Sequence, residues 1–122
     1  MAEINQKRVE VLHALGFCFG TEHYYRNRSK TFNYTDGIKI FCKKVHAYWL
    51  LDIVDSVVRT KYEMNEGLIK ITLRVKDNHT ARITFKKGIY LIYKQEIPFI
   101  DCPEGDWNFY YQKNLFFWIG EY

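Results

Sequence analysis

Residues 34–58, YTDGIKIFCKKVHAYWLLDIVDSVV, carry an apolar side chain at every third or fourth position. This spacing places the apolar side chains on one side of an α-helix, and no proline interrupts it. Thr35 and Asp36 stand at its start, where side-chain oxygens can accept hydrogen bonds from the first backbone N–H groups. The sequence therefore predicts one long helix over residues 34–58 whose apolar side needs a partner surface. The apolar side comprises Ile38, Phe41, Cys42, Val45, Trp49, Ile53 and Val57.

After residue 67 the apolar period changes from helical to alternating. In residues 68–75, LIKITLRV, apolar residues alternate with basic residues and threonine, which is typical of a strand with one buried face. The same alternation returns in residues 81–86, and short turn sequences precede a third strand over residues 89–99. Residues 107–118 are rich in aromatic side chains and predict a last hairpin.

A shorter amphipathic helix is predicted at the N-terminus, with Gly16 at its end. Helices followed by strands joined through tight turns indicate the α+β class. We predict a single domain over residues 1–122, with both helices packed on one face of an antiparallel sheet of four to five strands. Residues 17–33 are expected to form a loop with a short extended piece around Phe32. The apolar residues of the N-terminal helix are Ile4, Val11, Leu12 and Leu15.

The cysteines and the apolar runs bear on the compartment. Cys18, Cys42 and Cys102 are odd in number and far apart, which argues against a disulfide framework and against the close ligand pairs of a zinc site. We expect them to be small buried residues. No apolar run approaches the roughly 20 residues that a membrane span needs, and the N-terminus lacks the apolar core of a signal peptide. A cytoplasmic protein without membrane contact is expected.

Charge is distributed unevenly along the chain, although the net charge is only +4. Residues 1–67 carry ten basic and eight acidic side chains, residues 68–94 carry seven and one, and residues 95–122 carry one and five. A basic segment of this kind can attract a polyanion or an acidic protein surface, and an acidic segment can shield or orient it.

The basic residues of the first two predicted strands share the outward face with threonines. Such a surface can bind phosphate groups, with an affinity that depends on salt. Alternating lysine and threonine also serves simply to keep an exposed strand soluble, and the sequence leaves both interpretations open. The candidate binding residues are Lys70, Arg74, Arg82, Lys86, Lys87 and Lys94, together with Arg26 and Arg28 of the preceding loop.

Acid–base chemistry has one weaker candidate, the group of Glu22, His23 and Asp36. It would need these side chains to converge in a pocket. No metal-binding, nucleotide-binding or nucleophile motif accompanies them. We therefore predict no catalytic residue, no metal and no cofactor.

Five segments of the chain resemble, in order, the motifs of a small family that is classed only as a domain of unknown function. The family occurs chiefly in bacteria of the Bacteroidetes type, in their phages and in mobile elements. The resemblance covers roughly residues 19–122, but Ile119-Gly120 stand where the family usually has Pro-Ser. The matching segments are GTEHYYR (20–26), YTDGIK (34–39), AYWLLDIV (47–54), YKQEIPFID (93–101) and the terminal Glu121-Tyr122.

The chain is also similar to anti-CRISPR proteins directed at type VI-B RNA-targeting nucleases. This resemblance implies a non-enzymatic inhibitor that binds an RNA-guided defence ribonuclease, its guide RNA, or both. An inhibitor needs only a stable scaffold with a charged and aromatic face. Two alternatives stay open: a nucleic-acid-binding accessory protein of a mobile element, and a small enzyme that uses the Glu22, His23 and Asp36 group.

Overall fold

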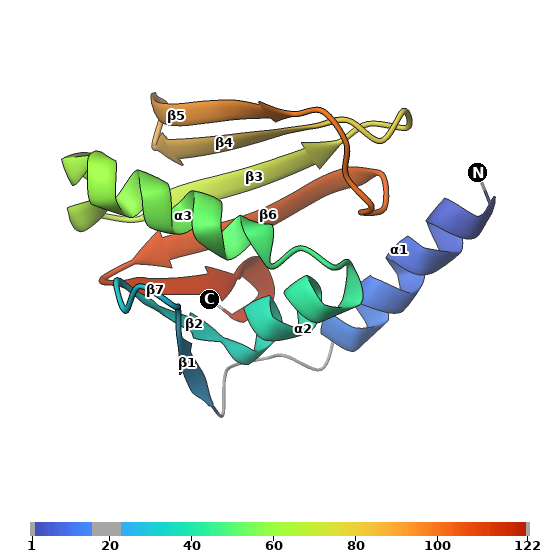
Figure 1. Ribbon diagram of the computed structural model, residues 1–122, viewed down its shortest axis with the longest axis horizontal. Coiled ribbons are helices and arrows are strands. Elements are labelled where there is room, and N and C mark those ends of the chain that lie inside the picture. Colours follow the sequence, from blue (N-terminus) through green and yellow to red (C-terminus); the bar gives the residue numbers. More distant parts are fainter. Residues whose placement is uncertain (1, 16–22, 122) are drawn as a thin grey trace.

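The fold is built on one seven-stranded sheet, with the strands in the order β1-β2-β7-β6-β3-β4-β5 (Figure 1). The structure is a computed structural model that describes the backbone of residues 2–15 and 23–121 and the side chains of residues 8–13, 15 and 23–121. Neighbouring strands are antiparallel except β2 and β7, which run parallel. The strands are β1 (Tyr24–Arg26), β2 (Asn33–Thr35), β3 (Ile69–Val75), β4 (Ala81–Lys87), β5 (Tyr90–Ile97), β6 (Gly105–Gln112) and β7 (Leu115–Trp118).

The α+β class is confirmed, but the sheet is larger than predicted and is mixed, not purely antiparallel. The two additional strands, β1 and β2, lie in and beside the segment expected to be a loop. Each has only three residues, which is too short for alternation to be recognised in the sequence. They enter the sheet because β2 pairs with β7, which is some 80 residues later in the chain, with Asn33 opposite Leu115.

The predicted long helix over residues 34–58 is wrong, because the chain forms two helices, α2 (Asp36–Lys44) and α3 (Trp49–Thr60). Between them His46 adopts the left-handed conformation, with φ of 55°. The backbone N–H of Ala47 then donates to the carbonyl of Cys42 at 2.9 Å, the closing bond of a Schellman motif. Glycine usually occupies the left-handed position of this motif, so histidine there gave no sign of a helix end.

The break also changes which residues α3 buries. α2 buries Ile38, Phe41 and Cys42 of the predicted apolar side. In α3 the first residue, Trp49, is only half-buried. The buried residues of α3 are Leu50, Leu51, Val54, Asp55 and Val57. Residues 45–48 interrupt the helical period, so one continuous stripe cannot describe both helices.

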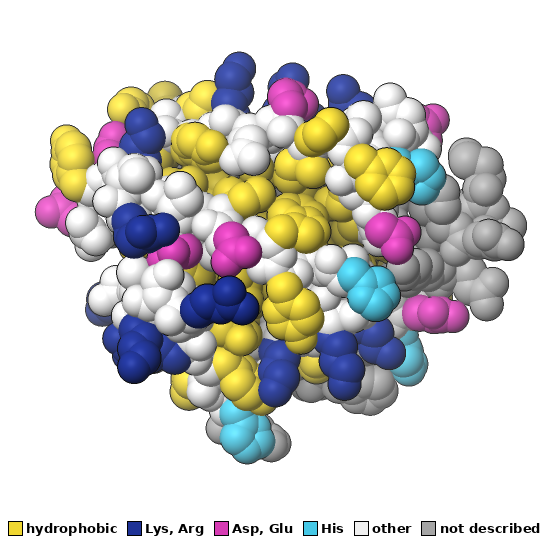
Figure 2. All heavy atoms as spheres, in the orientation of Figure 1, with side chains coloured by type: hydrophobic (Ala, Val, Ile, Leu, Met, Phe, Trp, Pro, Cys, Tyr) yellow, Lys and Arg dark blue, Asp and Glu magenta, His cyan; other side chains and the backbone are white. Residues whose placement is uncertain are grey.

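The helices cover one face of the sheet, with α2 and α3 in front of the strands in Figure 1. α1 (Ala2–Leu15) lies at one end and buries Val11 and Leu15 as predicted, whereas Leu12 is exposed. The side chain of Ile4 lies outside the described residues. On this face the charged side chains are scattered among hydrophobic ones (Figure 2). None of the described helices is both long and apolar enough to span a membrane.

The C-terminal end of the chain is tied to the start of α2 through Glu121. Its carboxylate accepts hydrogen bonds from the Thr35 hydroxyl at 2.6 Å, the Trp118 backbone N–H at 2.9 Å and the Gly37 backbone N–H at 3.2 Å. A carboxylate at a helix N-terminus satisfies backbone donors that have no partner within the helix. Residues Ile119–Glu121 form a 3₁₀ turn, η2, that places Glu121 there.

Candidate functional site

The outward side chains of the central strands form rows that run across the sheet. Those of β3 and β4 alternate with buried apolar residues, as predicted. One row places Arg74 directly opposite Arg82, and each arginine has a carboxylate on its other side, Asp106 on β6 and Glu96 on β5. The two arginines lie between the two carboxylates, so the formal charge of this row is zero.

Both arginines of this row are engaged in ion pairs. The Arg74 Nε lies 3.0 Å from the Asp106 Oδ1, and a second guanidinium nitrogen lies 3.3 Å from Oδ2. The hydrogen bond to Asp106 raises the pKa of Arg74. Arg82 is paired with Glu96 through its Nε. An anion that approached these arginines would therefore compete with carboxylates already in place.

The row at the opposite end of the strands has the reverse character. Lys70 lies directly opposite Lys86, and its neighbours across the sheet are Leu91 on β5 and Tyr110 on β6, neither of them acidic. Neither lysine makes an ion pair with any residue that the structure describes. Like charges directly opposite each other destabilise a sheet. An anion placed between the two lysines would relieve this repulsion.

Hydroxyl and amide groups lie between the two charged rows. Thr72 is opposite Thr84, and the row continues to Asn108 on one side and Lys94 on the other. The Thr72 hydroxyl donates to the Asn108 Oδ1 at 3.0 Å, which leaves the amide group of Asn108 as a donor for a ligand. These groups can complement an anion held by the lysines.

Eight of the side chains in these rows line a hollow of about 420 Å³, here called the basic hollow. It lies on the sheet face opposite the helices. Figures 1 and 2 view the molecule from the helix side, so the basic hollow is on the far side of both views. Ammonium, hydroxyl and amide groups are the donors that proteins use to bind phosphate oxygens. The lining residues are Lys70, Thr72, Arg74, Arg82, Thr84, Lys86, Asp106 and Asn108.

The other predicted binding residues are spread more widely. Lys94 is exposed beside the basic hollow, whereas Lys87 lies against Gly67 and is not part of the lining. Arg26 is on β1 and lines a separate hollow. Arg28 is exposed in the loop after β1 and lines neither hollow. The structure thus brings together four of the eight predicted residues.

Asp106, Glu96 and Asn108 belong to this site but were not among the residues predicted from the sequence. The acidic residues were recognised only as a C-terminal excess of negative charge. Their positions depend on β6 pairing with β3 and β5 pairing with β4, and in the first case the strands are separated by about 30 residues. The charge segregation was a real signal, but only the pairing shows which basic residues the acidic ones neutralise.

The acid–base candidates converge in part. The Asp36 carboxylate lies 3.8 Å from the His23 Nδ1 and accepts a hydrogen bond from the Tyr25 hydroxyl at 3.0 Å. Glu22 lies outside the described residues. The pKa of Tyr25 is raised, mainly by the hydrogen bond to Asp36. A tyrosine that acts as a base near neutral pH needs a lowered pKa instead. Lys39 sits over the Tyr25 ring, with its Nζ 4.1 Å from the ring centre.

The cysteine prediction holds where it can be checked. Cys42 and Cys102 are buried, and burial raises the pKa of Cys42 to about 12. A thiol with so high a pKa is a poor nucleophile and metal ligand. Cys18 lies outside the described residues. Among residues 2–15 and 23–121 no group of three or more His, Cys, Asp or Glu side chains is placed to hold a metal ion.

Comparison with curated proteins and with solved structures found no match. One family model matches, and it covers residues 9–122, nearly the whole chain. The family carries no assigned activity, so it supplies no site residues to compare with the basic hollow. The chain therefore belongs to the family of unknown function DUF6876.

Proposed function

We propose that this protein is a non-enzymatic inhibitor that binds an RNA-guided defence ribonuclease of bacteria and contacts the guide RNA through the basic hollow. The observation that carries the proposal is the pair Lys70 and Lys86, directly opposite each other and without a carboxylate neighbour among the described residues. This arrangement has an unfavourable charge distribution when empty and a favourable one when an anion is bound.

The phosphate backbone of RNA is an anion suited to this surface. The two lysines supply charge, Thr72, Thr84 and Asn108 supply neutral polar groups, and the hollow is open to an extended ligand. Such contacts fix the position of a nucleic acid without reading its sequence. The identity of the target as an RNA-guided ribonuclease rests on the resemblance to anti-CRISPR proteins, and the sheet face supports the RNA part of the proposal.

Co-purification with a type VI-B nuclease, with and without its guide RNA, tests the proposal. The informative variant is Lys70→Gln with Lys86→Gln. Its control is Lys43→Gln with Lys44→Gln, which removes two exposed lysines near the end of α2. We expect the wild type and the control to be retained by the guide-loaded nuclease and the first variant to be lost. Failure of the wild type to bind either form of the nuclease would contradict the proposal, as would equal retention of the two variants.

A second candidate function is a nucleic-acid-binding accessory protein of a mobile element. The same basic hollow favours it, because nothing in the hollow requires a protein partner. Both functions predict that the purified protein binds free single-stranded RNA at about 50 mM salt, where phosphate contacts are strong, so retention by the nuclease distinguishes them. Tight binding to free RNA together with no retention by the nuclease would favour this second function.

A further inference from the structure

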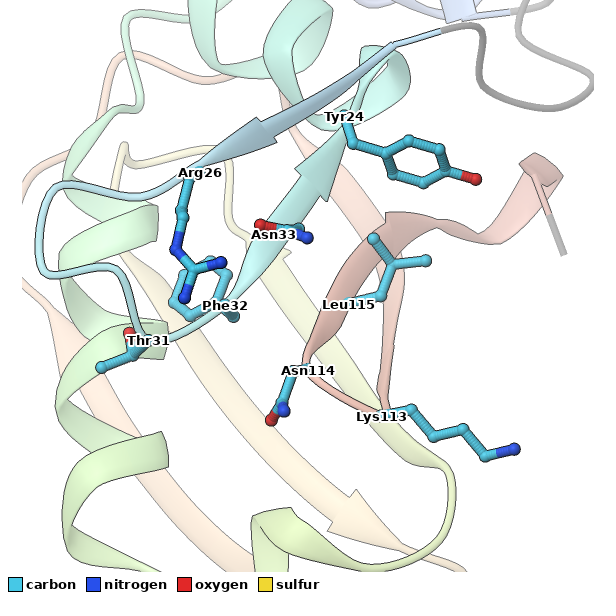
Figure 3. Close-up of a pocket in the computed structure, with 8 residues that line it drawn as sticks. All are labelled: Tyr24, Arg26, Thr31, Phe32, Asn33, Lys113, Asn114 and Leu115. Carbon is cyan, nitrogen blue, oxygen red and sulfur yellow. The ribbon is translucent and has the colours of Figure 1, made fainter.

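A second hollow of about 470 Å³ lies at the β1 edge of the sheet, bounded by β1, β2 and the turn between β6 and β7 (Figure 3). It is called the edge hollow here. The side chains of Arg26 and Asn33 lie over β1 and β2, and Tyr24, Leu115 and Lys113 stand on the other side, where Lys113 extends away from Arg26. Its lining residues are Tyr24, Arg26, Thr31, Phe32, Asn33, Lys113, Asn114 and Leu115.

The edge hollow opens on the same face of the sheet as the basic hollow. Lys70 is opposite Tyr110, Tyr110 is opposite Phe117, and Leu115 lies two residues before Phe117 on the same side of β7. Leu115 is in turn opposite Asn33, and Asn33 is opposite Arg26. With neighbouring strands about 4.8 Å apart, β2 and β3 are separated by about 14 Å.

The backbone around the edge hollow is held in place by several contacts. Lys113 and Asn114 both have positive φ, 51° and 62°, as in the two-residue turns that join twisted strands. The Asn33 N–H donates to the Asn114 carbonyl at 2.9 Å. On the other side the Asn27 and Thr31 side chains donate to the buried carboxylate of Asp55 on α3. The walls of the hollow therefore need little ordering when a ligand binds.

The polar and aromatic groups of the edge hollow match the parts of a nucleotide. Tyr24 is 61% exposed and offers a ring face on which a base can stack. Arg26 donates to the Lys30 carbonyl at 2.8 Å, and its other guanidinium nitrogens can bind a phosphate. The Asn114 Oδ1 accepts from the Tyr111 hydroxyl at 3.3 Å, so its amide group is a donor for the edge of a base, as is that of Asn33.

We propose that the edge hollow binds one unpaired nucleotide, with its base on Tyr24 and its phosphate on Arg26. This inference rests on the proposed binding of RNA by the sheet, and it adds that the RNA is single-stranded at this point. A paired base is stacked within a helix and cannot enter a hollow in a protein surface, whereas an unpaired base can.

Two labelled 12-nucleotide probes test the inference by fluorescence anisotropy: oligouridine RNA and an abasic ribose-phosphate chain of the same length and charge. Tyr24→Leu removes the ring face and keeps an apolar side chain. Tyr62→Leu is the matched control, because Tyr62 is 81% exposed and lines neither hollow. Lys70→Gln with Lys86→Gln reports separately on the basic hollow.

We expect the wild type to bind oligouridine more tightly than the abasic chain. Tyr24→Leu should weaken oligouridine binding about 5- to 150-fold, the range for loss of one base–aromatic stack, and leave abasic binding unchanged. The double lysine variant should weaken both probes by a similar factor. Equal affinity of the wild type for the two probes, or equal behaviour of Tyr24→Leu and Tyr62→Leu, would overturn the inference while RNA binding by the basic hollow stood. Binding of neither probe would overturn both.

Discussion

At one end of the basic hollow Arg74 faces Arg82, and at the other end Lys70 faces Lys86. Both pairs place two cations opposite each other on neighbouring strands. Each arginine has a carboxylate opposite it on the next strand, β6 or β5. The lysines have Tyr110 and Leu91 in the corresponding places. The arginine end is therefore neutral as it stands, and the lysine end is neutral only when an anion is bound.

This difference shows that a count of basic residues overstates the capacity of a surface to bind anions. Residues 68–94 carry seven basic side chains, but two of them are paired with carboxylates from β5 and β6. The pairing of strands that are distant in the sequence determines which cations stay available.

Both ends of the basic hollow depend on the same buried scaffold. Leu73 precedes Arg74 on β3, and its side chain is fully buried. Leu73→Ala should lower the free energy of unfolding by about 2–5 kcal/mol, because a large apolar side chain is lost from a packed core. Urea denaturation measures this, with Lys94→Ala as an exposed control that is expected to stay within about 0.5 kcal/mol of the wild type. A loss of less than about 1 kcal/mol for Leu73→Ala would mean that β3 does not pack as described.

Asp55 is a buried carboxylate, unlike the exposed carboxylates Asp106 and Glu96 of the sheet face. It accepts hydrogen bonds from Asn27 and Thr31 and forms an ion pair with Arg59 at 3.1 Å. Asp55→Ala should cost about 1–3 kcal/mol of stability, because its hydrogen-bond donors lose their acceptor. Asp52→Ala, at an exposed position of α3, should cost little.

The contribution of Asp55 should also depend on pH. Burial of Asp55 acts to raise its pKa, but hydrogen bonds from Thr31, Ser29 and Asn27 and the charge of Arg59 outweigh this and lower the pKa below 3.8. A carboxyl with a lower pKa in the folded state stabilises the protein above the unfolded pKa. This stability is lost as the pH falls below about 4. Urea midpoints of the wild type and Asp55→Ala should therefore converge between pH 6 and pH 3, and a constant difference would contradict the account.

The smallest expected effect on stability separates binding from folding. Lys86→Glu places a carboxylate opposite Lys70 and should raise the free energy of unfolding by about 0.2–1 kcal/mol, while RNA binding is lost. Thermal unfolding and anisotropy of the same sample measure the two effects. Lys94→Glu, which lies opposite Thr84, is the control for stability. Destabilisation by Lys86→Glu would show that the two lysines do not repel each other in the folded protein.

The sequence predicted the features that are set by local pattern. The alternation in β3 and β4 identified the outward Lys70, Arg74, Arg82 and Lys86, and the basic hollow contains all four. The helix end at His46 was missed because neither glycine nor proline marks it. β1 and β2 were missed because each is short and is stabilised by pairing within the sheet, not by its own composition.

The remaining features of the site depend on contacts between distant segments. The neutralisation of Arg74 by Asp106 requires the register between β3 and β6. The edge hollow combines β1 and β2 with a turn about 80 residues away. No local pattern of the chain specifies these pairings, so the sequence indicated a basic sheet face without showing which of its ends is neutral.

The salt dependence of single-stranded RNA binding shows which end of the basic hollow binds phosphate. Each phosphate contact contributes about 0.7 to the slope of log affinity against log salt concentration. If Lys70 and Lys86 bind phosphates, Lys70→Gln with Lys86→Gln should reduce the slope by about 1.4. Arg74→Gln with Asp106→Asn, which removes a neutral ion pair, should leave the slope unchanged. An unchanged slope in the lysine variant, or an equal reduction in both, would contradict the assignment of anion binding to the lysine end.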